Sequence, residues 1–223
     1  MENKGCNGIK RVSEFILNKE GKARRLNIKA VQAVLVARIR KVRLKEEVME
    51  WQELITDGYG RALQVLEKAL DGLTMDDLKE QPHPDCNSIG WLAWHLTRVQ
   101  DDHIADLMGE EQLWIKDKWH TRFNRRADSK DIGFGHSSED VAAFKPPDVE
   151  TLLEYHRAVL ERSRGYIINL SMADLDRELD EPWYQPLPTV GVRLVSVMSD
   201  SLQHAGQVSY LRGLLKGKGW LGV

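Results

Sequence analysis

The sequence predicts an all-α protein built as a four-helix bundle. Apolar residues recur at three- and four-residue spacing in four separate segments, which is the pattern of amphipathic helices. No segment has the alternation of apolar and polar residues that is typical of strands, and no tandem repeat is present. Four helices of this kind bury their apolar stripes most simply against one another.

The four helices are expected over residues 50–71, 87–108, 148–170 and 189–216. The second can begin at Asn87 or Ser88, both good N-cap residues, and Gly109 is expected to end it. The first and third helices are each followed by a short acidic turn, over 75–79 and 172–179, and then by a proline-rich loop. This similarity suggests two helical hairpins.

A connection of nearly forty residues, 110–148, separates the second helix from the third. It has little periodicity, and a loop of this length inside a domain is typical of a lid or binding loop. His120 and His136 could line a substrate entrance there. Its apolar anchors are expected to be Trp114, Trp119 and Phe123.

Composition excludes several classes of protein. The chain has 223 residues, 42% of them hydrophobic and 30% charged, and a net charge of −2, which gives no overall attraction to nucleic acid or anionic membrane. No apolar run reaches the roughly 18–20 residues that a membrane-spanning helix needs, and no signal peptide is visible. Two cysteines, Cys6 and Cys86, cannot form a disulfide framework, so we expect a cytoplasmic protein.

The charge distribution indicates a domain boundary near Val48. Residues 1–47 hold 13 Lys and Arg against 5 Asp and Glu, whereas the rest holds 19 against 29. We therefore expect a basic, poorly ordered extension over 1–48, which could be a start-site artefact, and a bundle domain over 49–223. An apolar patch over 30–39 could form a short basic amphipathic helix. A nucleic-acid or membrane-surface arm is the alternative interpretation.

Asp200 and His204 form the first part of a candidate metal site. Four residues advance a helix by about 400°, so the two side chains lie about 40° apart on one face. A carboxylate and an imidazole suit Zn²⁺, Ni²⁺ or Fe²⁺. His95, in the middle of the second helix, is the best third ligand. The alternatives are a core histidine for His95 and a solvated helix face for the pair, but a buried Asp200 would need a cation or hydrogen-bond donors.

Three segments stand out by their order and spacing: WLAWHLTRVQDDHI (91–104), GFGHSSEDVAAF (133–144) and SDSLQHAGQVSYLRGLL (199–215). Together they resemble the DinB-like superfamily, which includes the DUF664-type and mycothiol-dependent maleylpyruvate isomerase-type proteins. The resemblance covers roughly residues 49–217. It implies a four-helix bundle that binds one divalent metal, with Zn or Ni favoured over Fe or Mn, through His95, Asp200 and His204. The commonest family pattern has His at the position of Asp200, whereas the thiol-transferase branch has a carboxylate there.

Three protein ligands leave coordination positions open, which is the catalytic pattern. The resemblance implies a metal-dependent enzyme, a thiol S-transferase or isomerase in a bacterial cytoplasm, that activates a low-molecular-weight thiol toward a small electrophile. The alternative is a stress-response bundle that binds metal or a small ligand without turnover. A small-molecule substrate and a homodimer are the expected partners, and a membrane or nucleic acid is not expected.

Four further residues are candidates for supporting the metal ligands or lining the substrate site. Gln207 could orient a ligand or a bound water, and Asp102 could act from about 10 Å along the helix. His156 is interpreted mainly as a core histidine and secondarily as a fourth ligand. Arg212 could bind a substrate carboxylate, although an arginine near a helix C-terminus also suits the helix dipole.

Overall fold

The computed structural model describes residues 15–17, 23–25, 49–217 and 219, and the chain divides into two units, Met1–Met49 and Glu50–Val223. In the first unit, strands β1 (Phe15–Leu17) and β2 (Ala23–Arg25) pair antiparallel. The short helix predicted over 30–39 lies outside the described residues.

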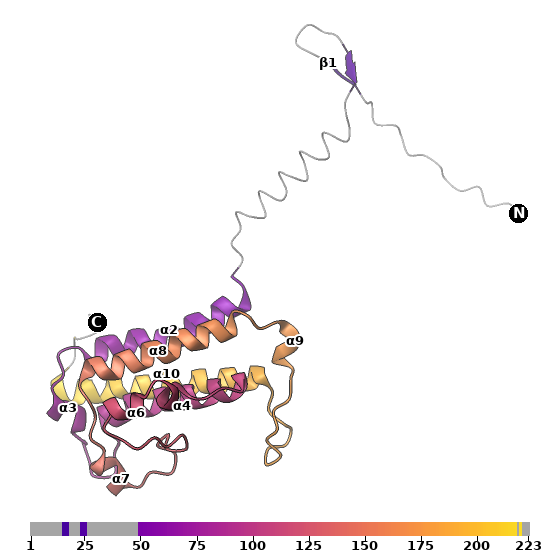
Figure 1. Ribbon diagram of the computed structural model, residues 1–223. Helices are drawn as coiled ribbons and strands as arrows, with labels where there is room; N and C mark the ends of the chain where they lie inside the picture. The colour runs from indigo at the N-terminus through magenta and orange to yellow at the C-terminus, as the bar shows by residue number, and fades with distance from the viewer. Residues whose placement is uncertain (1–14, 18–22, 26–48, 218, 220–223) are drawn as a thin grey trace, which may run out of the picture. The chain divides into compact units, whose positions relative to one another are not determined.

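The second unit confirms the all-α four-helix bundle (Figure 1). Its long helices are α2 (Trp51–Leu70), α4 (Ile89–Met108), α8 (Val149–Ile167) and α10 (Val190–Lys216). Helix α10 packs against α2 and α4, and α8 packs against the same two helices from the other side. The helices therefore follow one another around the bundle in the order α2, α10, α4, α8. None of the described helices is long and apolar enough to cross a membrane.

The helix ends follow the capping chemistry of the sequence. The side-chain oxygens of Ser88, Asp148 and Thr189 each accept a hydrogen bond from the backbone N–H three residues later. Gly109 ends α4 in the left-handed conformation, with φ of 65°. The acidic turns form the short helices α3 (Met75–Lys79) and α9 (Met172–Leu175).

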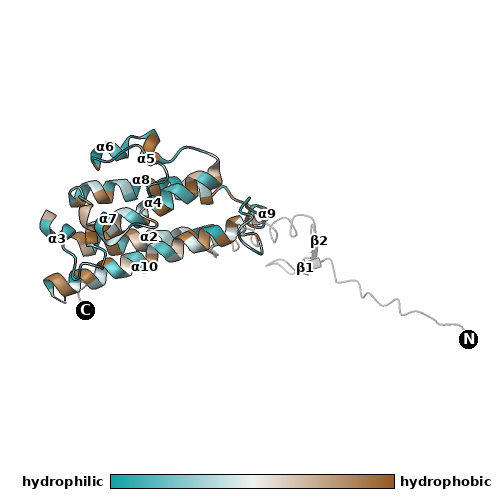
Figure 2. Ribbon diagram, turned by 90° about the horizontal axis from the view of Figure 1, so that it is seen from below, coloured by the Kyte–Doolittle hydropathy of each residue, from teal (hydrophilic) through white to brown (hydrophobic). Residues whose placement is uncertain are grey.

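Apolar residues from all four long helices form the core, and along each helix they are interleaved with polar residues (Figure 2). The packing is in two clusters. One surrounds Trp94 and Trp114, and the other surrounds Tyr59, whose hydroxyl donates a hydrogen bond to the carbonyl of Leu194 at 2.9 Å.

The long connection is folded onto the bundle. It contains the short helices α5 (Leu113–Lys116), α6 (Trp119–Arg122) and α7 (Ser138–Ala143). The anchors expected from the sequence are all buried, with 0%, 9% and 3% of their surface exposed at Trp114, Trp119 and Phe123.

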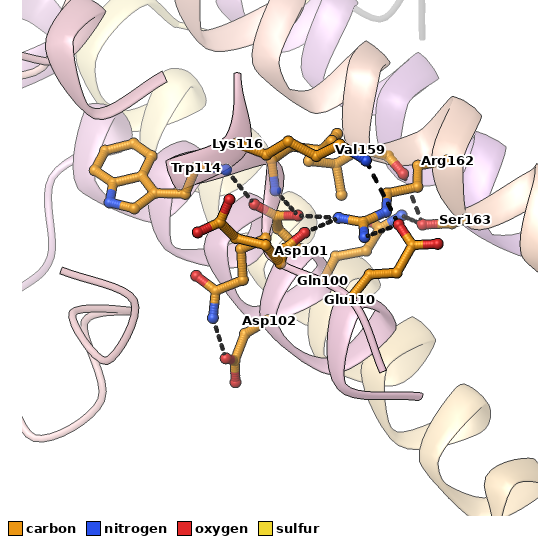
Figure 3. Close-up of polar contacts among 12 residues, drawn as sticks. Gln100, Asp101, Asp102, Glu110, Trp114, Lys116, Val159, Arg162 and Ser163 are labelled. Carbon is orange, nitrogen blue, oxygen red and sulfur yellow. Dashed lines mark hydrogen bonds and ion pairs between the residues drawn. The ribbon is translucent and has the colours of Figure 1, made fainter. Parts of the chain in front are cut away.

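Asp101 of α4 attaches the start of α5 to the bundle (Figure 3). Its carboxylate accepts hydrogen bonds from the backbone N–H groups of Leu113 and Trp114 at 2.9 and 2.8 Å, and from the hydroxyl of Tyr155 at 2.7 Å. Arg162 lies 3.5 Å from the same carboxylate. Because all these groups are largely withdrawn from water, the carboxylate holds the connection through several charge-assisted bonds.

Candidate metal centre

Two packed helices bring His95, Asp200 and His204 together. His95 lies in the first half of α4, and the other two lie one turn apart on α10. The helices run in opposite directions, so the rings of His95 and His204 meet edge to face with their centroids 4.9 Å apart. One potential ligand atom from each of the three residues lies within 4.8 Å of the others.

The hydrogen bonds of the two imidazoles determine which ring nitrogen of each can bind a metal ion. His95 Nδ1 lies 2.5 Å from the carbonyl oxygen of Ile132, which can only accept, so Nδ1 carries the proton. His204 Nδ1 donates to Gln207 Oε1 at 2.7 Å. In the neutral form both rings therefore have their lone pair on Nε2, and each is oriented by a hydrogen bond on the opposite nitrogen, as is usual for metal-bound histidines.

Asp200 completes a donor set that fits a metal ion. One carboxylate oxygen, Oδ1, lies 3.4 Å from His204 Nε2. Two donors that bind one ion at about 2.0–2.1 Å in tetrahedral geometry are about 3.3 Å apart. The other oxygen, Oδ2, is buried without a hydrogen-bond partner among the described residues. A buried carboxylate oxygen without a partner is costly, and a cation at this place would satisfy it.

The surroundings of the two histidines shift their pKa values in opposite directions. Burial lowers the pKa of His95, although the Ile132 carbonyl and the nearby Asp200 partly oppose this. The carboxylate of Asp200 accepts from Nε2–H of the protonated ring and so raises the pKa of His204, and a metal ion bound at Nε2 would take the place of that proton. The lowered pKa of His95 favours its neutral ring, which is the form that binds a metal ion.

A glycine turn in the long connection brings the Ile132 carbonyl to His95. Gly133 has φ of 90°, in the region that favours glycine, and a Cβ there would lie 2.8 Å from His95 Nδ1 and 2.9 Å from Trp91 Cζ2. The indole of Trp91 stacks on the His95 ring, with centroids 4.6 Å apart and planes 17° apart. His95 is thus held between an indole and the turn, and only 7% of its surface is exposed.

His136 holds this turn against α4. Its Nδ1 accepts a hydrogen bond from Trp91 Nε1 at 3.1 Å, so its proton is on Nε2, which lies 3.1 Å from Asp131 Oδ1. Arg125 donates to the other oxygen of Asp131 at 2.6 Å. The connection therefore forms part of the wall of the site, and His136, expected to line an entrance, contacts Trp91.

The structure places the supporting candidates at different locations. Gln207 hydrogen-bonds His204, as described above. Asp102 accepts a hydrogen bond from Gln112 at 2.5 Å, and the buried His156 is hydrogen-bonded to Thr97 at 3.0 Å, within the core. Arg212 donates to the backbone carbonyls of residues 69 and 71, at the end of α2.

Three residues of the turn beside His95 were not among the sequence candidates: Ile132 and Gly133, which lie against its ring, and Asp131, which binds His136 and Arg125. Ile132 acts through its backbone carbonyl, which any residue could supply, so its identity carries no signal. Only the pair of glycines at 133 and 135 indicated a special backbone conformation in this segment.

Two cavities open along the groove between α4 and α10, one beyond each end of the three-residue site. One, of about 600 Å³, is lined by residues that include Leu92 and Gln207. The other, of about 530 Å³, is lined by residues that include His103 and Arg193.

Comparison with known proteins agrees with this architecture. The sequence profile of the DinB superfamily matches residues 59–208, about two thirds of the chain. A crystal structure of the conserved protein of locus from Enterococcus faecalis is similar, with 27% identity and a TM-score of 0.71, over 77% of this chain and 100% of that one. No curated protein matches the sequence.

Proposed function

Because the chain belongs to the DinB superfamily, we propose that His95, Asp200 and His204 bind one divalent transition metal ion, and that the site activates a low-molecular-weight thiol for S-transfer or isomerisation of a small electrophile. The convergence of two Nε2 lone pairs with a carboxylate whose Oδ2 has no partner supports this most directly. Two imidazoles and a carboxylate suit zinc or nickel best, and iron or manganese also accept them.

A divalent ion held by three protein ligands would lower the pKa of a bound thiol or water and so supply a nucleophilic anion near neutral pH. The chain's own residues prepare the site for it. The carbonyl of Ile132 and the amide of Gln207 fix the proton of each imidazole on the side away from the donor atoms. Trp91 covers one face of His95 and excludes water from it.

Metal analysis tests the ligand set. We expect about one divalent ion per purified chain, and we expect His95→Ala and His204→Ala each to lose it. His103→Ala is the matched control, because it removes another partly buried imidazole of α4 that belongs to neither the site nor its hydrogen bonds. Retention of the ion in His95→Ala would remove that ligand from the assignment.

Turnover is tested separately. A panel of low-molecular-weight thiols is incubated with the metal-loaded protein and a neutral electrophile such as 1-chloro-2,4-dinitrobenzene, and thiol consumption is followed. We expect consumption that depends on the protein, the metal and one class of thiol. Stoichiometric metal without consumption of any thiol would favour the alternative, a bundle that binds metal or a small ligand without catalysis.

A further inference from the structure

The cavity of about 600 Å³ between the start of α4 and the C-terminal half of α10 has an uncharged lining. Apolar side chains and a few amides form its wall, and none of the described residues that line it carries a charge. They are Pro82, Cys86, Asn87, Leu92, Gln203, Gly206, Gln207, Tyr210, Leu211 and Leu214. Its volume is within the range of small-molecule sites, about 300–1,000 Å³.

This cavity adjoins the candidate metal centre. Gln207 belongs to its wall and also accepts the hydrogen bond from His204 Nδ1. Leu92, on the opposite wall, lies three residues before His95 on α4, which is about one helical turn. A molecule in the cavity would therefore have one end at the metal ligands.

The side chains that line the cavity determine which class of molecule it can bind. A charged ligand would lose its hydration without gaining a counter-ion, which is costly. The second cavity, by contrast, has Asp102, Asp106, Asp180 and Glu181 in its wall together with Arg177 and Arg193. A charged molecule would meet charged side chains in that wall, and it would meet none among the described residues that line the uncharged cavity.

We propose that the uncharged cavity binds the electrophile of the reaction, and that this electrophile is a neutral, mainly apolar molecule. The assignment rests on the proposed function. Leu92, Leu211 and Leu214 would cover the apolar body. Gln207 uses Oε1 to accept from His204, so the group it can offer is its amide NH₂, which can donate to a carbonyl or nitro oxygen of the acceptor.

Cys86 makes the binding measurable without turnover, because its exposed thiol lies in the cavity wall. The full-length, metal-loaded protein is alkylated with iodoacetamide, and modification of Cys86 and Cys6 is followed by peptide mass spectrometry. The probes are 2-naphthylmethanol, 2-naphthoate and 2-naphthylmethylamine, which share a ring system and differ in charge. We expect the neutral probe to protect Cys86 at concentrations at least about tenfold lower than either charged probe, with Cys6 as the internal reference.

A pair of glycines on α10 supplies the matched variants. Gly206 lines the cavity, Gly213 does not, and a Cβ at either position would meet no atom within 4 Å. We expect Gly206→Leu to fill the cavity and abolish protection, and Gly213→Leu to leave it unchanged. Both changes favour the helix, so the fold is retained, which circular dichroism checks. Tyr210→Ala, which shortens another wall residue, is expected to weaken protection.

Three results would overturn the proposal: equal protection by a charged probe, protection that survives Gly206→Leu, and no protection at all. Cys86 that reacts slowly without a probe and faster on dilution would assign the same surface to a second copy of the chain instead. Selective protection without thiol turnover would leave the cavity as a site for a neutral molecule and reject the proposed function. Turnover of 1-chloro-2,4-dinitrobenzene without protection of Cys86 would support the proposed function and reject the assignment of the cavity.

Discussion

At the scale of single residues, the site depends on one backbone position in the long connection. The carbonyl of Ile132 fixes the proton of His95 on Nδ1, and the turn that brings it there has no space for a side chain at Gly133. Gly133, which has no side chain, thus determines whether His95 presents its Nε2 lone pair.

We expect Gly133→Ala to lower metal affinity by about 10- to 100-fold, because it displaces the partner that orients a ligand. It should also lower the free energy of unfolding by about 2–4 kcal/mol, through backbone strain and the contact with His95. Gly135→Ala is the control, since its φ of 80° carries similar strain but a Cβ there meets no atom within 4 Å. Isothermal titration measures the metal affinity, and denaturant unfolding measures the free energy of unfolding. Equal loss of affinity in the two variants would contradict the role given to Gly133.

His156 gives a prediction for pH. Burial lowers its pKa to about 4, against about 6.5 in the unfolded chain. Between these values the unfolded state binds the proton and the folded state does not, so stability is full above pH 6.5 and falls as the pH decreases toward 4. The loss approaches about 3 kcal/mol.

Denaturant unfolding at pH 7 and pH 4.5 tests this, with His156→Gln as the variant that cannot titrate. The wild type should lose about 2–3 kcal/mol more than the variant over this interval. His103, whose pKa burial also lowers to about 4, is present in both proteins, so its contribution cancels. Identical pH dependence would mean that His156 can take up a proton in the folded state.

The sequence predicts the side chains of this site better than its backbone. His95, Asp200 and His204 could be found because imidazoles and carboxylates are rare on buried helix faces and the spacing of the last two is helical. Gln207 was a candidate because it lies three residues beyond His204 on the same helix. The role of the Ile132 carbonyl could not be predicted from the sequence, because every residue has a backbone carbonyl and its position depends on the tertiary fold.

At the scale of elements, α10 carries two of the three candidate metal ligands and α4 the third, while the connection supplies the contacts that hold His95. The helices were predictable to within a few residues because Ser88, Thr189 and Gly109 follow known capping rules. The short helices of the connection could not be predicted, since they have too few turns for a periodic pattern and depend on contacts with α4 and α8.

Asp101 is expected to be the main attachment of that connection. In Asp101→Asn, one oxygen becomes an NH₂ group that faces backbone donors, and the buried Arg98, 3.6 Å away, loses its counter-charge. We expect a loss of about 3–5 kcal/mol in the free energy of unfolding. Amide hydrogen exchange should become faster over residues 112–136. Asp106→Asn, an exposed carboxylate on the same helix, should change both quantities little.

At the scale of the whole molecule, the candidate site joins two helices whose ligands are about a hundred residues apart in sequence. The candidate ligand set exists only when α4 and α10 are packed, so an ion that binds there would bind the folded chain far more tightly than the unfolded chain. The proposed metal binding would therefore stabilise the bundle.

Free metal at about 100 times its dissociation constant should stabilise the fold by about 2.7 kcal/mol. For a chain of this size, this raises the melting temperature by roughly 5–10 °C relative to the protein in EDTA. Scanning calorimetry with stepwise additions of Zn²⁺ or Ni²⁺ measures the increase. His204→Ala should melt at one temperature with and without metal, and His103→Ala should keep the increase. A wild-type melting temperature that does not respond to metal would mean that these three residues do not bind an ion in the folded protein, and thiol activation by this site would be excluded with it.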